Sequence, residues 1–202
     1  MPEPAARPGP GRPPSGARER VLDAGLEVLK RDGYAGLTTA KVAARSGQNK
    51  ALISYHFGSK EGLVAAVARE VSDAITAELL GSVGDPRSTD ELVRSLVAGL
   101  WRILERDQGL QRVYFDLASQ SVVEPRVRDV MREMKQAHRS VLRDFLVALP
   151  DGPGRRGAEA AAVYLIAGLE GLALEHLERG DTPALRRARE LFARTAPAAL
   201  AG

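Results

Sequence analysis

Apolar residues recur at steps of three and four along almost the whole chain after residue 17. In the first such stretch, Val21, Leu22, Leu26 and Leu29 fall on one face of a helix, because an α-helix has 3.6 residues per turn. No segment alternates between apolar and polar residues for long enough to predict a strand. The pattern therefore predicts an all-α protein of about nine helices.

Start and stop signals divide this pattern into separate helices. Gly33 and Gly47 follow periodic segments as expected of helix ends, Ser59 is typical of an N-cap, and Pro125 restarts the chain. The helices of the first third are expected over about 18–32, 39–46, 48–57 and 60–80. Those of the remainder are expected within 85–107, 110–121, 126–149, 158–178 and 183–196.

Residues 1–17 differ from the rest, because Pro, Gly and Arg dominate them. Such a composition cannot bury apolar surface and predicts a disordered basic arm. The segment Gly11-Arg12-Pro13 leaves open a second interpretation, an arm that reads the minor groove of DNA.

Charge is unevenly distributed along the chain. Residues 1–60 contain 10 Lys and Arg against 5 Asp and Glu, a balance of +5, whereas residues 61–202 contain 19 against 21, a balance of −2. This asymmetry favours an anionic partner for the first third, with chance as the alternative. The absence of cysteine excludes disulfides and thiolate metal sites and favours a cytoplasmic setting.

The two short helices around Gly47 indicate a helix-turn-helix. If Ile53 is at the centre of the buried face of the second helix, Phe57 lies within about 40° of it at 100° per residue. Gln48, Ala51 and Tyr55 then point to the opposite side, where no carboxylate occurs between residues 47 and 60. The alternative is an ordinary helical corner with a solvated face.

The exposed side of this corner offers the groups that DNA recognition requires. Its small and hydrogen-bonding side chains suit the major groove, and its cations and helix N-termini suit backbone phosphates. The candidate DNA contacts are Thr39, Lys41, Gln48, Asn49, Lys50, Ala51, Leu52, Ser54, Tyr55 and Lys60.

The segment "LTTAKVAARSGQNKALISYHFGSKEGL", residues 37–63, resembles the DNA-binding segment of TetR-family transcriptional regulators. The resemblance covers about residues 18–65 and leans toward the betaine-responsive regulators. Two positions depart from the family pattern. Family members often have Val at the position of Gln48, and many have Thr at the position of Leu52. The resemblance implies contacts to DNA or phosphate by Thr39, Lys50, Tyr55, His56 and Lys60.

With this resemblance, three parts are expected: the arm over 1–17, a DNA-binding domain over 18–63, and a regulatory and dimerisation domain over 64–202. The segment 158–178 is apolar over most of its circumference and contains small residues that permit close helix approach. Together with 184–196 it is expected to form a homodimer interface, and a two-fold dimer would bind a palindromic operator in double-stranded DNA. The alternative is the central helix of a monomer.

A pocket for an unknown small-molecule effector is expected between the middle helices, although aromatic residues at helical spacing more often belong to a core. The candidate lining residues are Trp101, Tyr114, Phe115, Phe145 and Tyr164, with polar contacts from Arg102, Asp116, Gln120 and His138. No catalytic motif, metal-binding spacing or cofactor motif occurs.

The sequence therefore predicts a DNA-binding regulator that is not an enzyme, most simply a homodimeric repressor released by a ligand. Two alternatives remain open. One is an architectural DNA binder of the same fold without a ligand, and the other is a helical small-molecule carrier with no role on DNA.

Overall fold

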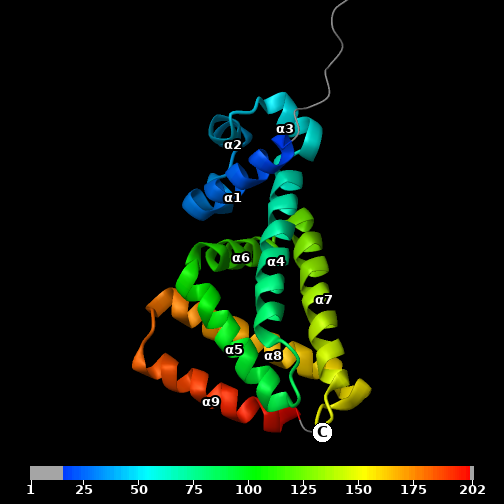
Figure 1. Cartoon of the computed structure of the whole chain (residues 1–202). Helices are drawn as coiled ribbons and strands as arrows, with labels where there is room; N and C mark the ends of the chain where they lie inside the picture. The colour runs from blue at the N-terminus through cyan, green and yellow to red at the C-terminus, as the bar shows by residue number, and fades with distance from the viewer. Residues whose placement is uncertain (1–15, 201–202) are drawn as a thin grey trace, which may run out of the picture.

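The computed structural model describes residues 16–200, which form nine helices and no strand, as the sequence predicts (Figure 1). The expected arm at 1–17 lies almost wholly outside the described residues. The helices are α1 (Ala17–Gly36), α2 (Thr39–Ser46), α3 (Lys50–Phe57), α4 (Lys60–Val83), α5 (Thr89–Arg106), α6 (Gln108–Gln120), α7 (Pro125–Ala148), α8 (Gly154–Arg179) and α9 (Pro183–Leu200).

Side-chain caps determine where the three helices after α1 begin. The Thr38 hydroxyl accepts a hydrogen bond from the backbone N–H of Lys41 at 3.2 Å, and Asn49 Oδ1 accepts one from Leu52 at 2.8 Å. The Ser59 hydroxyl caps α4 in the same way at 3.1 Å. Each cap satisfies an N–H group that has no partner within its own helix.

The end of the first helix is more complex than the sequence predicts. Gly33 has φ +69° and ψ −178°, so helical geometry is interrupted at the expected position, but one further turn follows to Gly36. Glycine adopts positive φ without the steric penalty of a Cβ atom.

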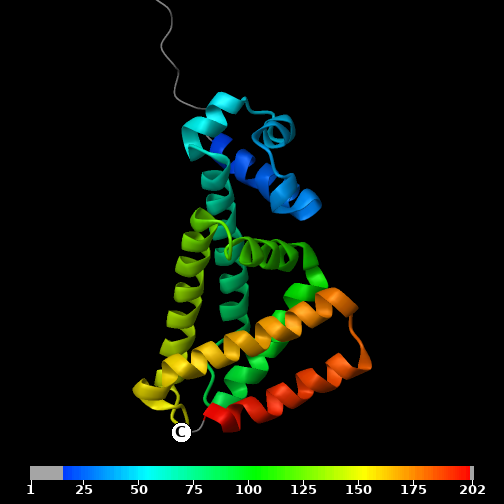
Figure 2. The ribbon, with the colours of Figure 1, turned by 180° about the vertical axis from the view of Figure 1, so that it is seen from behind.

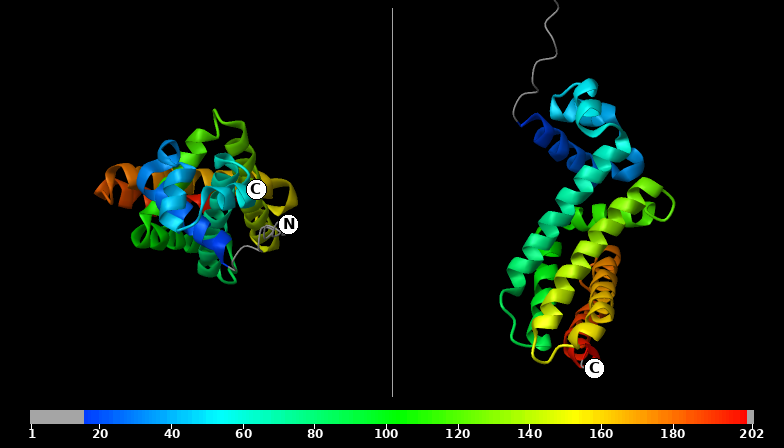
Figure 3. Two further views of the ribbon diagram at one scale, coloured as in Figure 1. Left: turned by 90° about the horizontal axis from the view of Figure 1, so that it is seen from above. Right: turned by 90° about the vertical axis from the view of Figure 1, so that its right-hand side faces the viewer.

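Two clusters of buried apolar side chains make up the interior. The long helix α4 runs from the helix-turn-helix toward the far end of α5 (Figures 1 and 3). The first cluster joins α1–α4 to α6 and the first half of α7. The second joins α5, the end of α7, α8 and α9. Because the first cluster continues from the helix-turn-helix into α6 and α7, the helix-turn-helix packs directly on the helices that follow it.

Helices α8 and α9 pack against each other on one side of the molecule (Figure 2). By length and composition α8 would be able to cross a membrane, but here it packs on α7 and α9 as part of the fold. Only 28% of its most apolar 18 residues are buried. Large apolar side chains remain exposed on this side, at Val163, Tyr164, Leu174 and Leu191.

Candidate nucleic-acid interface and effector cavity

The orientation of α3 is the central feature of the helix-turn-helix. Ile53 is 1% exposed and packs in the first apolar cluster, whereas Tyr55 is 75% exposed. Gly47 ends α2 with φ +67° and provides the sharp turn into α3. The burial of Ile53 thus turns the opposite face of α3 outward, as the helical phase predicts.

The outward side combines small, polar and cationic side chains. Lys50, Ala51, Ser54 and Tyr55 are exposed, together with Asn49, whose side chain caps α3. The remaining predicted contacts in this segment are half-buried, namely Thr39, Gln48, Leu52, His56 and Lys60. These predicted contacts are therefore all at least partly accessible to solvent.

The cations at this surface differ in their partners. Among the described residues, no carboxylate lies within ion-pair distance of Lys50 or Lys60. The ammonium group of Lys41 instead donates to Asp32 Oδ2 at 2.7 Å and to the Gly36 carbonyl at 2.9 Å. Hydrogen bonds from Arg31 and Lys41 hold the pKa of Asp32 well below its usual value. Lys41 thus links α2 to the end of α1 within the domain.

His56 lies at the edge of the surface rather than at its centre. Its ring packs edge-on against Tyr55, with centroids 5.2 Å apart, and its Nε2 atom is buried without a hydrogen-bond partner in the described structure. That nitrogen therefore does not face outward, although the side chain is partly exposed.

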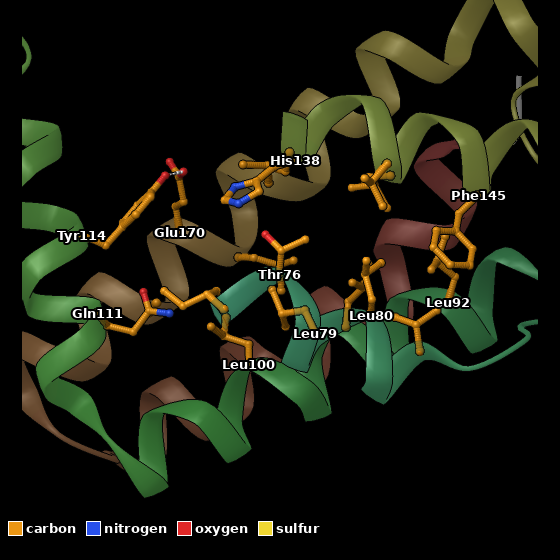
Figure 4. A pocket seen from close by; sticks show the side chains of 18 residues that line it. Thr76, Leu79, Leu80, Leu92, Leu100, Gln111, Tyr114, His138, Phe145 and Glu170 are labelled. Carbon is orange, nitrogen blue, oxygen red and sulfur yellow. Dashed lines mark hydrogen bonds between the residues drawn. The ribbon is translucent and has the colours of Figure 1, made fainter. Parts of the chain in front are cut away.

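A cavity lies among the helices that follow the helix-turn-helix, lined by side chains from α4, α5, α6, α7 and α8 (Figure 4). The centres of water-sized spheres can occupy about 120 Å³ of it, and the empty space, open solvent included, amounts to about 870 Å³. Leucine side chains and Phe145 dominate one end, whereas Gln111, Tyr114, His138 and Glu170 gather toward the other. The cavity is thus apolar along most of its length and polar at one end.

Glu170 is the centre of the polar end. Its carboxylate accepts a hydrogen bond from the Tyr114 hydroxyl, and Lys135 Nζ lies 3.2 Å from its other oxygen. Burial, followed by the Glu170 charge, raises the pKa of Tyr114, so this hydroxyl remains a donor at neutral pH. A polar ligand group that donates a hydrogen bond can replace one of these two donors at the Glu170 carboxylate.

His138 contributes a neutral group beside Glu170. Its Nε2 lies 3.0 Å from the Ser72 hydroxyl of α4. Burial lowers the pKa of His138, and the Lys135 charge acts in the same direction, whereas Glu170 and Asp73 oppose the shift. The imidazole is consequently uncharged at pH 7.

The structure brings only some of the predicted pocket residues to this cavity. Tyr114, Phe145 and His138 line it. Trp101 is buried between His176 and Arg189, because its position on α5 turns it toward α8 and α9. The other predicted residues also lie away from the lining, namely Arg102, Phe115, Asp116, Gln120 and Tyr164.

Three polar lining residues were not predicted from the sequence: Thr76, Gln111 and Glu170. Glu170 had a detectable signal, because it is the only charged residue between Val163 and Leu174. An isolated acid in an apolar helix usually has a partner or a function. Thr76 and Gln111 carry no comparable signal.

The fold and these two features define a helix-turn-helix DNA-binding regulator with a helical regulatory domain. Residues 21–67 match the family of bacterial regulatory proteins, tetR family, and residues 102–201 match the C-terminal domain of the BetI-type transcriptional repressor. The HTH-type transcriptional regulator BetI of Paraburkholderia xenovorans (strain LB400) is 30% identical over 153 residues, which are 73% of this chain and 77% of that protein. The chain belongs to the TetR family of bacterial regulatory proteins.

Solved structures show the same fold. A putative TetR-family regulator from Rhodococcus sp. superimposes with a TM-score of 0.75 at 22% identity, covering 93% of this chain and 100% of that one. The multidrug binding protein EbrR complexed with ethidium gives 0.69 at 23% identity, covering 88% and 97%. A putative regulator from Saccharomonospora viridis in complex with choline gives 0.67 at 18% identity, covering 90% and 95%.

Family membership confirms the resemblance found in residues 37–63 and the lean toward the betaine-responsive subgroup. The chain is a DNA-binding transcriptional repressor, and its relatives are transcriptional regulators rather than enzymes. No observation favours a carrier without a role on DNA.

Proposed function

We propose that this repressor acts as a homodimer on a palindromic operator and that a small organic molecule releases it. The observation that carries the proposal is the presence, in one chain, of an outward α3 face without acids and of a partly enclosed cavity between the helices that support it. A ligand-free architectural role would be better served by a closed core.

The uncovered apolar side of α8 and α9 supports the dimer. Val163, Tyr164, Leu174 and Leu191 are each 41–51% exposed, which is a large apolar area for one side of a soluble chain. A Cβ atom at Gly171 would meet no other atom, so a neighbouring helix has room to approach there. A second copy, related by a two-fold axis, would cover this side with the same side.

On DNA, the α3 helix of each subunit would occupy the major groove. Ala51 allows its backbone to lie deep, and Gln48, Ser54 and Tyr55 would contact base edges. Lys50 and Lys60, which have no carboxylate partner within residues 16–200, would contact phosphates. Thr39, Asn49, Leu52 and His56, at the edges of the surface, would also contact DNA. Lys41 would act indirectly, because its hydrogen bonds to Asp32 and Gly36 link α2 to the end of α1.

The cavity suggests an effector with an apolar body and one polar or cationic end. The leucine-lined end would take the apolar part, and the Glu170 carboxylate would take the other. The ethidium and choline bound to the two regulators of the same fold are both organic cations. In this chain an entering cation would replace Lys135 beside Glu170.

Release would follow from a shift between two conformations. The effector must bind the state with mismatched recognition helices more tightly than the DNA-bound state, because equal affinity for both shifts nothing. Since the target is the operator, the protein would act in the cytoplasm, where bacterial DNA lies.

Selection of bound sequences from random duplex DNA tests the proposal. We expect enrichment of an inverted repeat whose half-sites are about one helical turn apart, or a multiple of it. Organic cations of increasing apolar size would then be screened for loss of binding to that operator, with Glu170→Gln as the matched variant. Enrichment of a single half-site would contradict the dimer, and an operator complex insensitive to all of these cations would contradict the effector class.

A further inference from the structure

Helix α6 presents two opposite faces to two parts of the molecule. Gln111 and Tyr114 point into the cavity (Figure 4). Asp116 lies two residues after Tyr114, hence about 200° further around the helix. Its side chain reaches α1, the first helix of the DNA-binding part. One short helix therefore contacts both the cavity and the DNA-binding part.

Asp116 binds the end of α1 at the point where helical geometry is interrupted. Gly33 combines a positive φ with an extended ψ, and the backbone N–H of the next residue, Tyr34, donates a hydrogen bond to Asp116 Oδ2 at 2.6 Å. A Cβ atom at Gly33 would lie 3.2 Å from the same oxygen. The last turn of α1 is thus capped by a side chain from the regulatory part.

The second contact that fixes α6 to the same segment is an ion pair. Lys30 Nζ lies 2.6 Å from Asp107 Oδ2, at the N-terminus of α6. Burial alone would raise the pKa of Asp107, but the hydrogen bond and charge of Lys30 bring it below its usual value. α6 therefore holds α1 at two points one helical turn apart, Lys30 and Tyr34.

Tyr34 in turn faces a cation of the proposed DNA surface. Lys60 Nζ lies 4.5 Å from the centre of the Tyr34 ring, within the range of a cation–π interaction. Among the described residues Lys60 has no carboxylate partner. The ring is therefore the principal group that orients this ammonium.

Taking the proposed DNA surface as given, we propose that Asp116 is a positioning residue for DNA binding. It holds Tyr34 from the regulatory part, and Tyr34 holds Lys60 toward the phosphate backbone. A displacement of α6 that separates Asp116 from the Tyr34 N–H would release Lys60 without any change in α3. Because Gln111 and Tyr114 of α6 line the cavity, an effector bound there would be able to shift α6 and so break the contact between Asp116 and Tyr34.

The direction in which Asp116→Ala changes the affinity for DNA distinguishes this positioning role from a general effect of charge. Asp116→Ala removes a negative charge, which by itself would strengthen binding to DNA. We expect instead a loss of about three- to tenfold per half-site, the effect of one hydrogen bond. Asp116→Asn keeps an acceptor oxygen and should bind nearly as the natural protein does. Asp144→Ala, the same change of charge at the far end of α7, is the control and should not weaken binding.

Double variants test whether Asp116 and Tyr34 act through Lys60. Tyr34→Leu should cost about two- to fivefold per half-site, whereas Tyr34→Phe, which keeps the ring, should cost little. In the Lys60→Ala background, neither Asp116→Ala nor Tyr34→Leu should cause a further loss, because the group they position is gone.

Binding would be measured on the full-length protein with an operator duplex at three salt concentrations, beside the melting temperature of each variant. Losses that multiply in the double variants, or an Asp116→Ala protein that binds as tightly as the natural one, would overturn the positioning role. A natural protein that binds no duplex at low salt would instead refute the proposed DNA surface.

Discussion

The opposite environments of Ile53 and Tyr55, two residues apart on α3, give a sharp test of how this helix is oriented. Ile53→Ala removes three methyl or methylene groups from a site that is 1% exposed. Such changes cost about 2–5 kcal/mol, and in a chain of this length each kcal/mol lowers the melting temperature by about 2–4 °C. We therefore expect a drop of roughly 4–20 °C.

Tyr55→Ala should leave the stability of the protein almost unchanged but weaken its binding to the operator. The side chain is 75% exposed, so the change in stability should stay within about 0.5 kcal/mol. Loss of a base contact costs about 1–3 kcal/mol, which lowers operator affinity by about five- to 150-fold per half-site. Tyr55→Phe separates the hydroxyl from the ring.

Circular dichroism melting, at one protein concentration for all variants, measures the change in melting temperature. Fluorescence anisotropy of a labelled operator at fixed salt measures the change in operator affinity. If Tyr55→Ala melts as early as Ile53→Ala, the outward face of α3 has been misidentified. If it melts normally and binds DNA normally, Tyr55 is not a contact.

Three further changes test separate parts of the molecule. Leu191→Arg should convert a dimer to a monomer at micromolar concentration in light scattering, since it places a charge in the proposed α8–α9 interface; an unchanged mass would exclude that surface. Gly47→Ala should lower the melting temperature by a few degrees, because a Cβ at φ +67° costs about 1–2 kcal/mol, and an unaffected protein would contradict the turn geometry. His138 has a lowered pKa in the folded state, so the unfolded chain binds its proton first and stability should fall as the pH drops below about 6.5. His138→Gln should lessen this loss in urea unfolding at pH 7.5, 6 and 5, and equal acid sensitivity in both proteins would refute the assignment.

The helix-turn-helix was predictable from sequence because its signals are local. Thr38, Asn49 and Ser59 cap helices through hydrogen bonds to residues three positions further on, and Gly47 meets a backbone requirement of its own turn. Once Ile53 is taken as the buried centre of α3, the helical period alone places Tyr55 on the outer side. None of these inferences requires knowledge of what packs against α3.

The cavity was less predictable because it depends on how distant helices rotate against one another. Tyr114 and Phe115 are adjacent and equally aromatic, yet only Tyr114 faces the cavity. Asp116, expected as a ligand contact, binds Tyr34 across 82 positions of sequence. Periodicity fixes which residues share a face, but it does not state which neighbour that face meets.

The chain contains one tryptophan and no cysteine, which makes it unusually convenient for spectroscopy. The indole of Trp101 is buried edge-on against His176, with the Arg189 guanidinium 4.5 Å above its ring, and the adjacent Leu100 lines the cavity. Its fluorescence therefore reports on a single known location, one residue away from the cavity wall. A single introduced cysteine would likewise accept a dye at one chosen place, so the distance between the α3 helices of the proposed dimer could be followed in solution without removing any native group.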